Sequence, residues 1–250
     1  MTDIPKDHPR YKSLLVREML VKGVNDGITS MQGLIAQGRG EAFDYLIGER
    51  TTASAGQATK AAVALLLLAR HPVISVNGNA AAISSAELCE LAREINAPVE
   101  VNLFHRTEER VTRIIALLRS KGCTTTIYGD SPDRLIPGLS HDRAKATSNG
   151  IWDADVVLVP LEDGDRCEAL LKMGKKVVTI DLNPMSRTAK TASVTIVDNI
   201  VRAVPNMTKM ACEMKGMSRP ELEKIVADFC NPDSLAEALA EMMEYVKKSS

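Results

Sequence analysis

The sequence has none of the features that would place the protein outside the cell or in a membrane. Its N-terminus, MTDIPKDHPRYK, lacks the apolar core of a signal peptide. The longest apolar run, from Ala61 to Ala69, is far shorter than the roughly 20 residues that span a bilayer. These absences predict a cytoplasmic protein that makes no contact with a membrane.

Cysteines are few and scattered along the chain. Five are present, and no two form a C-x-x-C pair: Cys89, Cys123, Cys167, Cys212 and Cys230. An odd number at irregular spacing argues against a disulfide framework and against a zinc cluster. Reduced thiols in a cytosolic protein are the expectation.

The sequence also lacks an excess of charge of either sign. Its 31 Lys and Arg residues nearly balance its 32 Asp and Glu residues, for a net charge of -1. Proteins that bind nucleic acid regardless of sequence usually carry a strongly basic domain or stripe. The balance therefore argues against a nucleic-acid partner, while it allows a local basic pocket for a small phosphorylated ligand.

Hydrophobic residues make up 45% of the 250 residues, enough for a sizeable core. Three helices are predicted before residue 72. Pro9 suits the first turn of the first, since its missing N–H loses no partner there. The second has an apolar stripe that includes Met31, Leu34 and Ile35. The third, from about Thr51 to Arg70, is apolar on every side in its last half, which predicts burial in the core or at a subunit interface.

After residue 72 the pattern changes to short β-branched runs with helical stretches between the early ones. The runs are VISV from Val73, VEVNLF from Val99, TTTIY from Thr124, DVVLVPL from Asp155, KVVTIDL from Lys176 and SVTIV from Ser193. This alternation predicts βαβ units in a mostly parallel, doubly wound sheet. The expected parts are a helical portion over residues 1–71, an α/β core over 72–200 and C-terminal helices over 201–250, packed as one compact unit. A capping box at Ser218 and Glu221 starts one of those last helices.

One connection in the predicted sheet is short. Only residues 183–192 separate the last two strands, whereas a parallel crossover usually needs about a dozen residues or more. The segment is therefore either a long functional loop or a turn into an antiparallel strand.

Ligands of open α/β sheets bind outside the carboxyl ends of the strands, so the residues that follow each strand are the first site candidates. Asn77, Gly78 and Asn79 follow the first strand, where small residues can bring backbone N–H groups close to a phosphate. His105 and Arg106 follow the second, and an arginine there can bind phosphate or carboxylate through two hydrogen bonds. The alternatives are a tight strand-to-helix turn and an exposed polar turn.

The stretch after Ile180 is the most informative, because it follows a buried strand and is rich in hydroxyl groups. Asp181 is suited to accept hydrogen bonds from ribose hydroxyls or to hold a magnesium ion. Arg187, Thr188 and Lys190 are suited to grip phosphates. The alternative is an ordinary solvated loop.

Two glycines flank Arg39 inside the second predicted helix, at a cost of about 1 kcal/mol each relative to alanine. Close approach of a ligand or of another backbone would offset that cost. The alternative is a loop that resembles a helix. A complete G-x-G-x-x-G fingerprint, a G-x-x-x-x-G-K-[ST] loop and an H-E-x-x-H motif are all missing, which leaves a dinucleotide-dependent oxidoreductase without support.

Six long stretches share their sequence and order with a known family. They are IPKDHPRYKSLLVREMLVKGVNDGIT, GLIAQGRGEAFDYLIGERTT, HPVISVNGNAAA, LFHRTEERV, VTIDLNPMSRTAKTASVTIVDN and VPNMTKMA. Together they resemble archaeal phosphopantothenate synthetase over most of the chain, from residue 4 to about residue 245. The resemblance implies a Rossmann-like, homodimeric ligase of coenzyme A biosynthesis. Such an enzyme condenses 4-phosphopantoate with β-alanine to 4'-phosphopantothenate, uses ATP and Mg²⁺, and releases AMP and diphosphate.

The resemblance also implies residue roles. The positions expected to contact ATP are Arg17, Arg39, Asp181, Leu182, Asn183, Arg187, Thr188, Asn199 and Ile200. From the strand ends we predict that Asn77, Gly78, Asn79 and Arg106 bind phosphopantoate. His105 and Lys190 are the candidate catalytic residues, with Lys190 at the α-phosphate; metal ligands are not assigned. A non-catalytic nucleotide sensor and an NAD(P)-dependent oxidoreductase are the rival interpretations.

Overall fold

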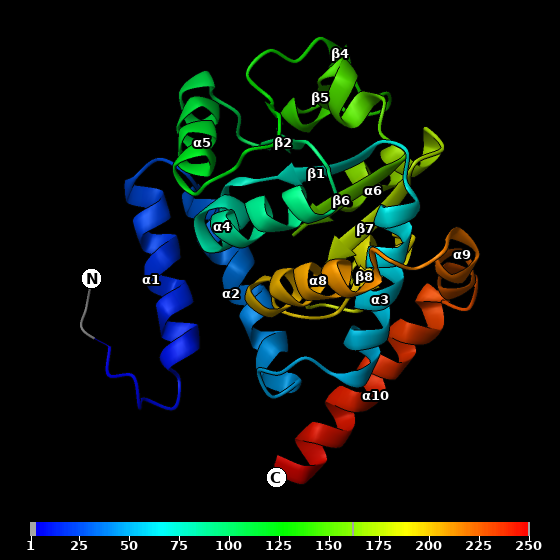
Figure 1. The fold of residues 1–250 in the computed structure, drawn as a ribbon. Helices are drawn as coiled ribbons and strands as arrows, with labels where there is room; N and C mark the ends of the chain where they lie inside the picture. Colours follow the sequence, from blue (N-terminus) through cyan, green and yellow to red (C-terminus); the bar gives the residue numbers. More distant parts are fainter. Residues whose placement is uncertain (1–3, 162, 250) are drawn as a thin grey trace.

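The computed structural model describes residues 4–161 and 163–249 and shows a central sheet with helices on both faces (Figure 1). Three helices come first: α1 (Tyr11–Asn25), α2 (Met31–Leu46) and α3 (Ala53–Leu68). The sheet strands are β1 (Pro72–Val76), β2 (Val99–Val101), β3 (Ile127–Tyr128), β6 (Val156–Pro160), β7 (Lys176–Ile180) and β8 (Val194–Ile196). They are parallel and lie in the order β3-β2-β1-β6-β7-β8.

The remaining helices connect and cover these strands. They are α4 (Gly78–Glu94), α5 (Glu108–Ser120), α6 (Gly164–Lys172), α7 (Arg187–Thr191), α8 (Ile200–Met214), α9 (Arg219–Ala227) and α10 (Asn231–Ser249). The chain runs outward from β1 to β3 and then returns to β6 on the other side of β1. The chain therefore reverses its direction of winding between β1 and β6, where open α/β sheets form their ligand crevice.

Alternate side chains of the strands pack on opposite faces of the sheet, as the period of two requires. In β6, Val156 and Leu158 belong to the larger core, together with side chains of α3, α4 and α8. Val157 and Val159 point the other way and pack against α6. Because both faces are covered, the strands are mostly apolar, with Ser75, Glu100, Thr179 and Thr195 as buried polar exceptions.

The predicted α/β class and the six predicted strand runs are confirmed, although the strand within TTTIY is shorter than its run. The antiparallel alternative for the last strand is wrong, because Val178 of β7 pairs with Val194 of β8 in parallel. The short helix α7 lies inside that connection and lets a compact crossover return to the same edge. The division of the chain at residues 71 and 200 stays a prediction.

Most predicted helices are confirmed, with small differences at their ends. Pro9 does not lie in the first turn of α1, which starts at Tyr11; it lies in the turn that precedes the helix. The apolar end of α3 is buried against the sheet, as predicted. The capping box is present: the Ser218 backbone N–H donates to the Glu221 carboxylate at 2.7 Å.

Between β3 and β6 the chain forms an excursion, residues 129–155, which we call the insert. It contains a small antiparallel pair, β4 (Arg134–Leu135) and β5 (Lys145–Ala146), a 3-10 turn η1 (Asp142–Ala144) and a π-helical turn η2 (Ser148–Trp152). Buried polar side chains of β2 and of the loop that follows it anchor the insert. The Glu100 carboxylate accepts hydrogen bonds from the backbone N–H groups of Thr147 (3.0 Å) and Ile151 (2.7 Å). The Asn102 amide donates to the Lys145 carbonyl at 2.7 Å.

Burial raises the pKa of Glu100 to about 7, although the two backbone hydrogen bonds and the nearby Arg166 and Arg106 lower it. The folded state therefore holds a proton that the unfolded state releases near pH 4.5. The free energy of unfolding should therefore fall by about 3 kcal/mol as pH rises from about 4.5 to 7. We expect Glu100→Gln to remove this decline, measured by urea unfolding across that pH range.

The control for this experiment is Glu109→Gln, because Glu109 is an exposed residue of α5 that pairs with Arg113. This variant should keep the parent's pH dependence. Parallel pH profiles for Glu100→Gln and the parent protein would show that Glu100 titrates alike in both states, contrary to the expectation.

Candidate active site

Two cavities open at the carboxyl edge of the sheet, between the strand ends and α2. The first, of about 470 Å³, is lined by Ala36, Gln37, Arg39, Gly40, Ala42, Phe43, Asn79, Leu161, Asp163, Asp181, Leu182, Asn183, Ser186, Thr188, Asn199 and Ile200. The second, of about 280 Å³, is lined by Thr29, Ser30, Gln32, Gly33, Ala36, Arg39, Asn77, Gly78, Asn79, Leu103, Phe104, His105, Arg110, Arg143, Leu161 and Asp163. They share five residues, so they form one continuous cleft.

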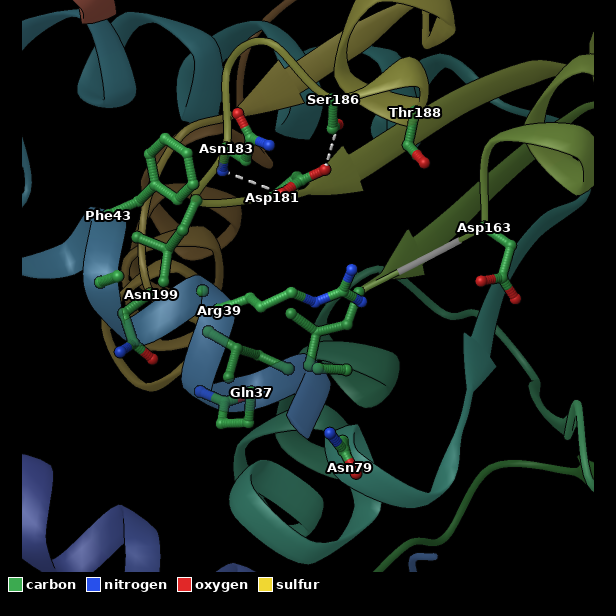
Figure 2. Close-up of a pocket in the computed structure, with 16 residues that line it drawn as sticks. Gln37, Arg39, Phe43, Asn79, Asp163, Asp181, Asn183, Ser186, Thr188 and Asn199 are labelled. Carbon is green, nitrogen blue, oxygen red and sulfur yellow. Dashed lines mark hydrogen bonds between the residues drawn. The ribbon is translucent and has the colours of Figure 1, made fainter. Parts of the chain in front are cut away.

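The loop between β7 and α7 forms one wall of the first cavity. Asp181 directly follows β7, and its carboxylate accepts hydrogen bonds from the Asn183 backbone N–H (2.9 Å) and from the Ser186 hydroxyl (Figure 2). Burial raises the pKa of Asp181, although these hydrogen bonds and the charge of Arg39 lower it. The loop is thereby held in a fixed shape, with its hydroxyl, amide and carboxyl groups facing the cavity.

The start of α8 forms another wall of the first cavity and is fixed by a buried ionic network. The side-chain amide of Asn199, the N-cap of α8, donates to the Asp44 carboxylate of α2 at 2.7 Å. Arg202 pairs with Asp198 at 2.6 Å and also with Asp44. Burial raises the pKa of Asp198 although Arg202 lowers it. This network fixes α2 relative to the sheet and so sets the width of the first cavity.

The N-terminus of α4 forms the base of the second cavity, at the point where the strand order reverses. The Asn77 side chain caps α4 through Ala80 and donates to the carbonyls of Pro160 (3.0 Å) and Leu161 (3.1 Å), which joins the ends of β1 and β6. A Cβ on Gly78 would lie 2.6 Å from the Ile28 carbonyl oxygen, so glycine is required for this close approach.

Two arginines supply positive charge to the second cavity. Arg110 of α5 donates to the carbonyls of Ile28 (3.2 Å) and His105, while its Nε has no hydrogen-bond partner within the described structure. Burial lowers the pKa of Arg110. Arg143 comes from the insert and donates to the Asn102 carbonyl at 2.7 Å. The cavity is thus suited to an anionic ligand group.

Arg39 lies where the two cavities meet. Figure 2 shows its side chain reaching from α2 across the cleft, with Asp181 and Ser186 on one side and Asn79 on the other. Asp163, after β6, lies on the opposite wall. A cation at this junction can contact ligands in both cavities at once, which is the arrangement needed to bring two anionic groups together.

Ten of the predicted contact residues line the cleft together with His105: Asn77, Gly78, Asn79, Arg39, Asp181, Leu182, Asn183, Thr188, Asn199 and Ile200. The others lie elsewhere. Arg17 of α1 pairs with Glu41 of α2 at 2.8 Å, and Arg187 pairs with Glu168 at 2.6 Å. Arg106 pairs with Glu108 at 3.0 Å, and Lys190 is exposed outside both linings. The roles predicted for these four stay predictions.

Three charged groups of the cleft were not predicted as site residues: Arg110, Arg143 and Asp163. Asp163 follows the fourth predicted strand, and the strand-end rule would have found it had it been applied there. Arg110 lies one helical turn after Thr107. Only the packing of α5 in the folded structure shows that the Arg110 side chain points into the second cavity. Arg143 reaches the cleft through the insert, for which the sequence gives no signal.

The cleft contains few carboxylates that could hold a metal ion. Within residues 4–161 and 163–249, no three His, Cys, Asp or Glu side chains gather as a metal site. Magnesium usually keeps several waters and is held by one or two carboxylates together with substrate phosphates. Asp181, which lines the first cavity, fits such a metal, carried into the cleft by a phosphorylated ligand.

Two further observations concern the cysteines and the length of the helices. All five cysteines are free. None of the helices in the described segments is long and apolar enough to cross a membrane.

Comparison with known proteins gives consistent matches along the chain. The model of the family described as phosphopantothenate/pantothenate synthetase matches residues 54–245. A 4-phosphopantoate–beta-alanine ligase of Thermococcus kodakarensis is 59% identical over 239 residues, which cover 96% of this chain and 92% of that protein. A protein of the same name from Methanosarcina mazei is 58% identical, with coverage of 99% and 97%. Another, from Methanospirillum hungatei, is 54% identical, with coverage of 84% and 86%.

Proposed function

Because this chain belongs to the phosphopantothenate/pantothenate synthetase family, we propose that it is a ligase that condenses 4-phosphopantoate with β-alanine. The product is 4'-phosphopantothenate, an intermediate of coenzyme A biosynthesis. The co-substrate in this proposal is ATP with Mg²⁺, and the other products are AMP and diphosphate. The observation that carries the proposal is the pair of joined cavities with one arginine, Arg39, at their junction.

The two cavities differ in the groups that they offer. The first, with Asp181, Asn183 and Asn199, offers polar groups that suit a ribose and a phosphate chain. The second, with Arg110 and the N-terminus of α4, suits a phosphate monoester, since backbone N–H groups and the helix dipole favour an anion there. We therefore assign ATP to the first cavity and the phosphate of phosphopantoate to the second.

With that placement, the carboxylate of phosphopantoate meets the α-phosphorus of ATP beside Arg39. A carboxylate and an amine do not condense in neutral water without activation, and an acyl-adenylate supplies it. Two anions must approach for its formation, so Arg39 offsets their repulsion and the charge that develops as diphosphate leaves. Asp181 would hold Mg²⁺ together with the ATP phosphates, and the bound ion would neutralise further charge on them. Positioning in the cleft provides much of the remaining rate enhancement.

The test is formation of AMP and diphosphate by the purified protein. We expect it to require ATP, phosphopantoate and β-alanine together. We also expect exchange of labelled diphosphate into ATP with phosphopantoate alone, since an acyl-adenylate forms before β-alanine reacts. Binding of ATP without turnover would instead indicate a nucleotide sensor, and binding of NAD(P) in place of ATP would indicate an oxidoreductase.

We further propose that two copies of the chain pair through the outer face of α2. Large apolar side chains are exposed there, among them Met31 and Ile35, and Ile35 is 70% exposed. Such a row of exposed apolar side chains is typical of an interaction surface. Arg17 of α1 pairs with Glu41 of α2 and lines neither cavity of its own chain, so in this dimer its predicted contact with ATP would be made to the other copy.

A charge in this surface should separate the copies. We expect Ile35→Glu to reduce the mass in solution from twice 27.1 kDa to 27.1 kDa, measured by light scattering. The control is Leu135→Glu in β4 of the insert, a residue that is 66% exposed. An unchanged mass for Ile35→Glu would place the interface elsewhere.

A further inference from the structure

Two oppositely charged side chains meet on the wall of the second cavity. The Nε atom of Arg143 lies 3.5 Å from Oδ2 of Asp163. Arg143 comes from η1 of the insert, and Asp163 comes from the chain between β6 and α6. Both line the second cavity, and Asp163 lines the first as well. The pair therefore reaches the junction at which Arg39 lies.

The two members of the pair differ in their exposure. The Arg143 side chain is only 3% exposed and is held in place by its hydrogen bond to the Asn102 carbonyl. The Asp163 side chain is 49% exposed, and Figure 2 shows its carboxylate on the wall opposite Arg39. An ion pair with one half-exposed member contributes little to stability. A role in ligand binding would explain why the Arg143–Asp163 pair lies in the cleft.

The charge of Asp163 is unfavourable for two of the three substrates. A carboxylate at the junction repels both the phosphates of ATP and the carboxylate of phosphopantoate. The third substrate, β-alanine, is a zwitterion, and its ammonium group is the one organic cation of the reaction. This ammonium must reach the acyl carbon, which lies at the junction where the cavities meet.

We propose that Asp163 and Arg143 form the subsite for β-alanine. Asp163 binds the ammonium group at the junction, and Arg143 binds the carboxylate. Two methylene groups separate the charged ends of β-alanine. Its ammonium group can therefore meet Asp163 while its carboxylate meets Arg143. The assignment rests on the proposed function. Arg110, Arg39 and the loop after β7 are assigned to phosphopantoate and ATP, and this pair adds a position for the third substrate.

The subsite accounts for the second half of the reaction. The ammonium loses one proton to become a nucleophile, and the resulting amine attacks the acyl carbon. The new C–N bond forms, the C–O bond to AMP breaks, and its electron pair leaves on the AMP phosphate. The nitrogen then loses a second proton, so two protons reach solvent for each amide formed. Asp163 holds the nitrogen in position while these protons depart.

The test is Asp163→Asn, which removes the charge and keeps the size of the side chain. We expect the KM for β-alanine to rise roughly tenfold or more, as for loss of one hydrogen bond to a charged group. Exchange of diphosphate into ATP, which needs no β-alanine, should stay within about twofold of the parent rate. The matched control is Asp165→Asn, because Asp165 lies two residues further on, outside both cavity linings, and bonds His141 at 2.8 Å.

Several outcomes would overturn the assignment. An unchanged KM for β-alanine in Asp163→Asn is one. Loss of exchange together with a shifted magnesium dependence is another, since it would make Asp163 a metal ligand. If the parent protein shows no exchange, the adenylate route is wrong, while the KM for β-alanine still tests the subsite. Should Asp163→Asn fail to fold, Arg143→Lys provides the second measurement: the KM for β-alanine should rise with exchange retained, and an unchanged value contradicts the proposal.

Discussion

Replacement of Arg39 by alanine is expected to lower kcat/KM by roughly 100-fold or more, because Arg39 lines both cavities and would contact a ligand in each under the proposed function. One hydrogen bond to a charged group contributes about 1.5–3 kcal/mol, and two such contacts would be lost. The KM values for ATP and for phosphopantoate should both rise, and kcat should fall because the charge on the transferring phosphorus is no longer offset. Steady-state kinetics with each substrate varied in turn measures all three quantities.

The control for Arg39 is Arg70→Ala, since Arg70 lies before β1 with its side chain 85% exposed. This variant should match the parent protein. If Arg39→Ala raised the KM for only one substrate, Arg39 would belong to a single cavity, and the account of the junction would be wrong.

The largest effect on stability is expected from Gly150→Ala in η2. A Cβ at this position would lie 2.0 Å from Oε2 of Glu100, the atom that accepts from the Ile151 N–H. Overpacking and the loss of a buried hydrogen bond should together lower the free energy of unfolding by about 4 kcal/mol. The insert carries Arg143, so the KM for β-alanine should rise in any protein that still folds.

Gly56→Ala is the matched control for this substitution. Gly56 lies in α3, and a Cβ there would meet nothing within 4 Å. Alanine is the better helix former by about 1 kcal/mol, so this variant should be slightly more stable than the parent. Urea unfolding of the two variants beside the parent measures both effects. A Gly150→Ala protein as stable as the parent would mean that Glu100 does not anchor the insert.

The sheet could be predicted from the sequence because its strands are buried on both faces. Such strands appear in the sequence as short runs rich in β-branched residues. It also predicted the loop after β7, where Asp181 follows a buried strand and hydroxyl residues cluster. Both signals are local. They depend on the period of the strand and on the rule that ligands bind at strand ends, and neither needs knowledge of how helices pack.

The rest of the cleft depends on contacts between segments far apart in the chain. Arg110 faces the second cavity only because α5 packs beside the loop that joins α1 and α2, where Arg110 reaches the Ile28 carbonyl. Arg143 depends on the insert, which buried Glu100 and Asn102 hold from β2 and the loop after it. A charged residue within an irregular segment has no periodicity to mark its direction, so residue patterns alone could not place it.

Packing within the protein does not require the two glycines that flank Arg39. A Cβ on Gly38 would meet nothing within 4 Å, and one on Gly40 would make ordinary contact with Leu182 at 3.6 Å. Neither glycine is required by close approach of protein backbone within the described residues. Contacts within the protein therefore do not explain why α2 keeps two glycines, which are poor helix formers. Gly40 lines the first cavity.

The most direct measurement of the central claim is a crystal structure with phosphopantoate and α,β-methylene-ATP, which cannot release diphosphate. The account predicts the triphosphate in the first cavity along the loop after β7, and the phosphate monoester in the second cavity at Arg110. The Arg39 guanidinium should lie between the α-phosphate and the substrate carboxylate. A nucleotide bound instead in the third cavity of about 680 Å³, between α1 and the start of α8, would contradict the account.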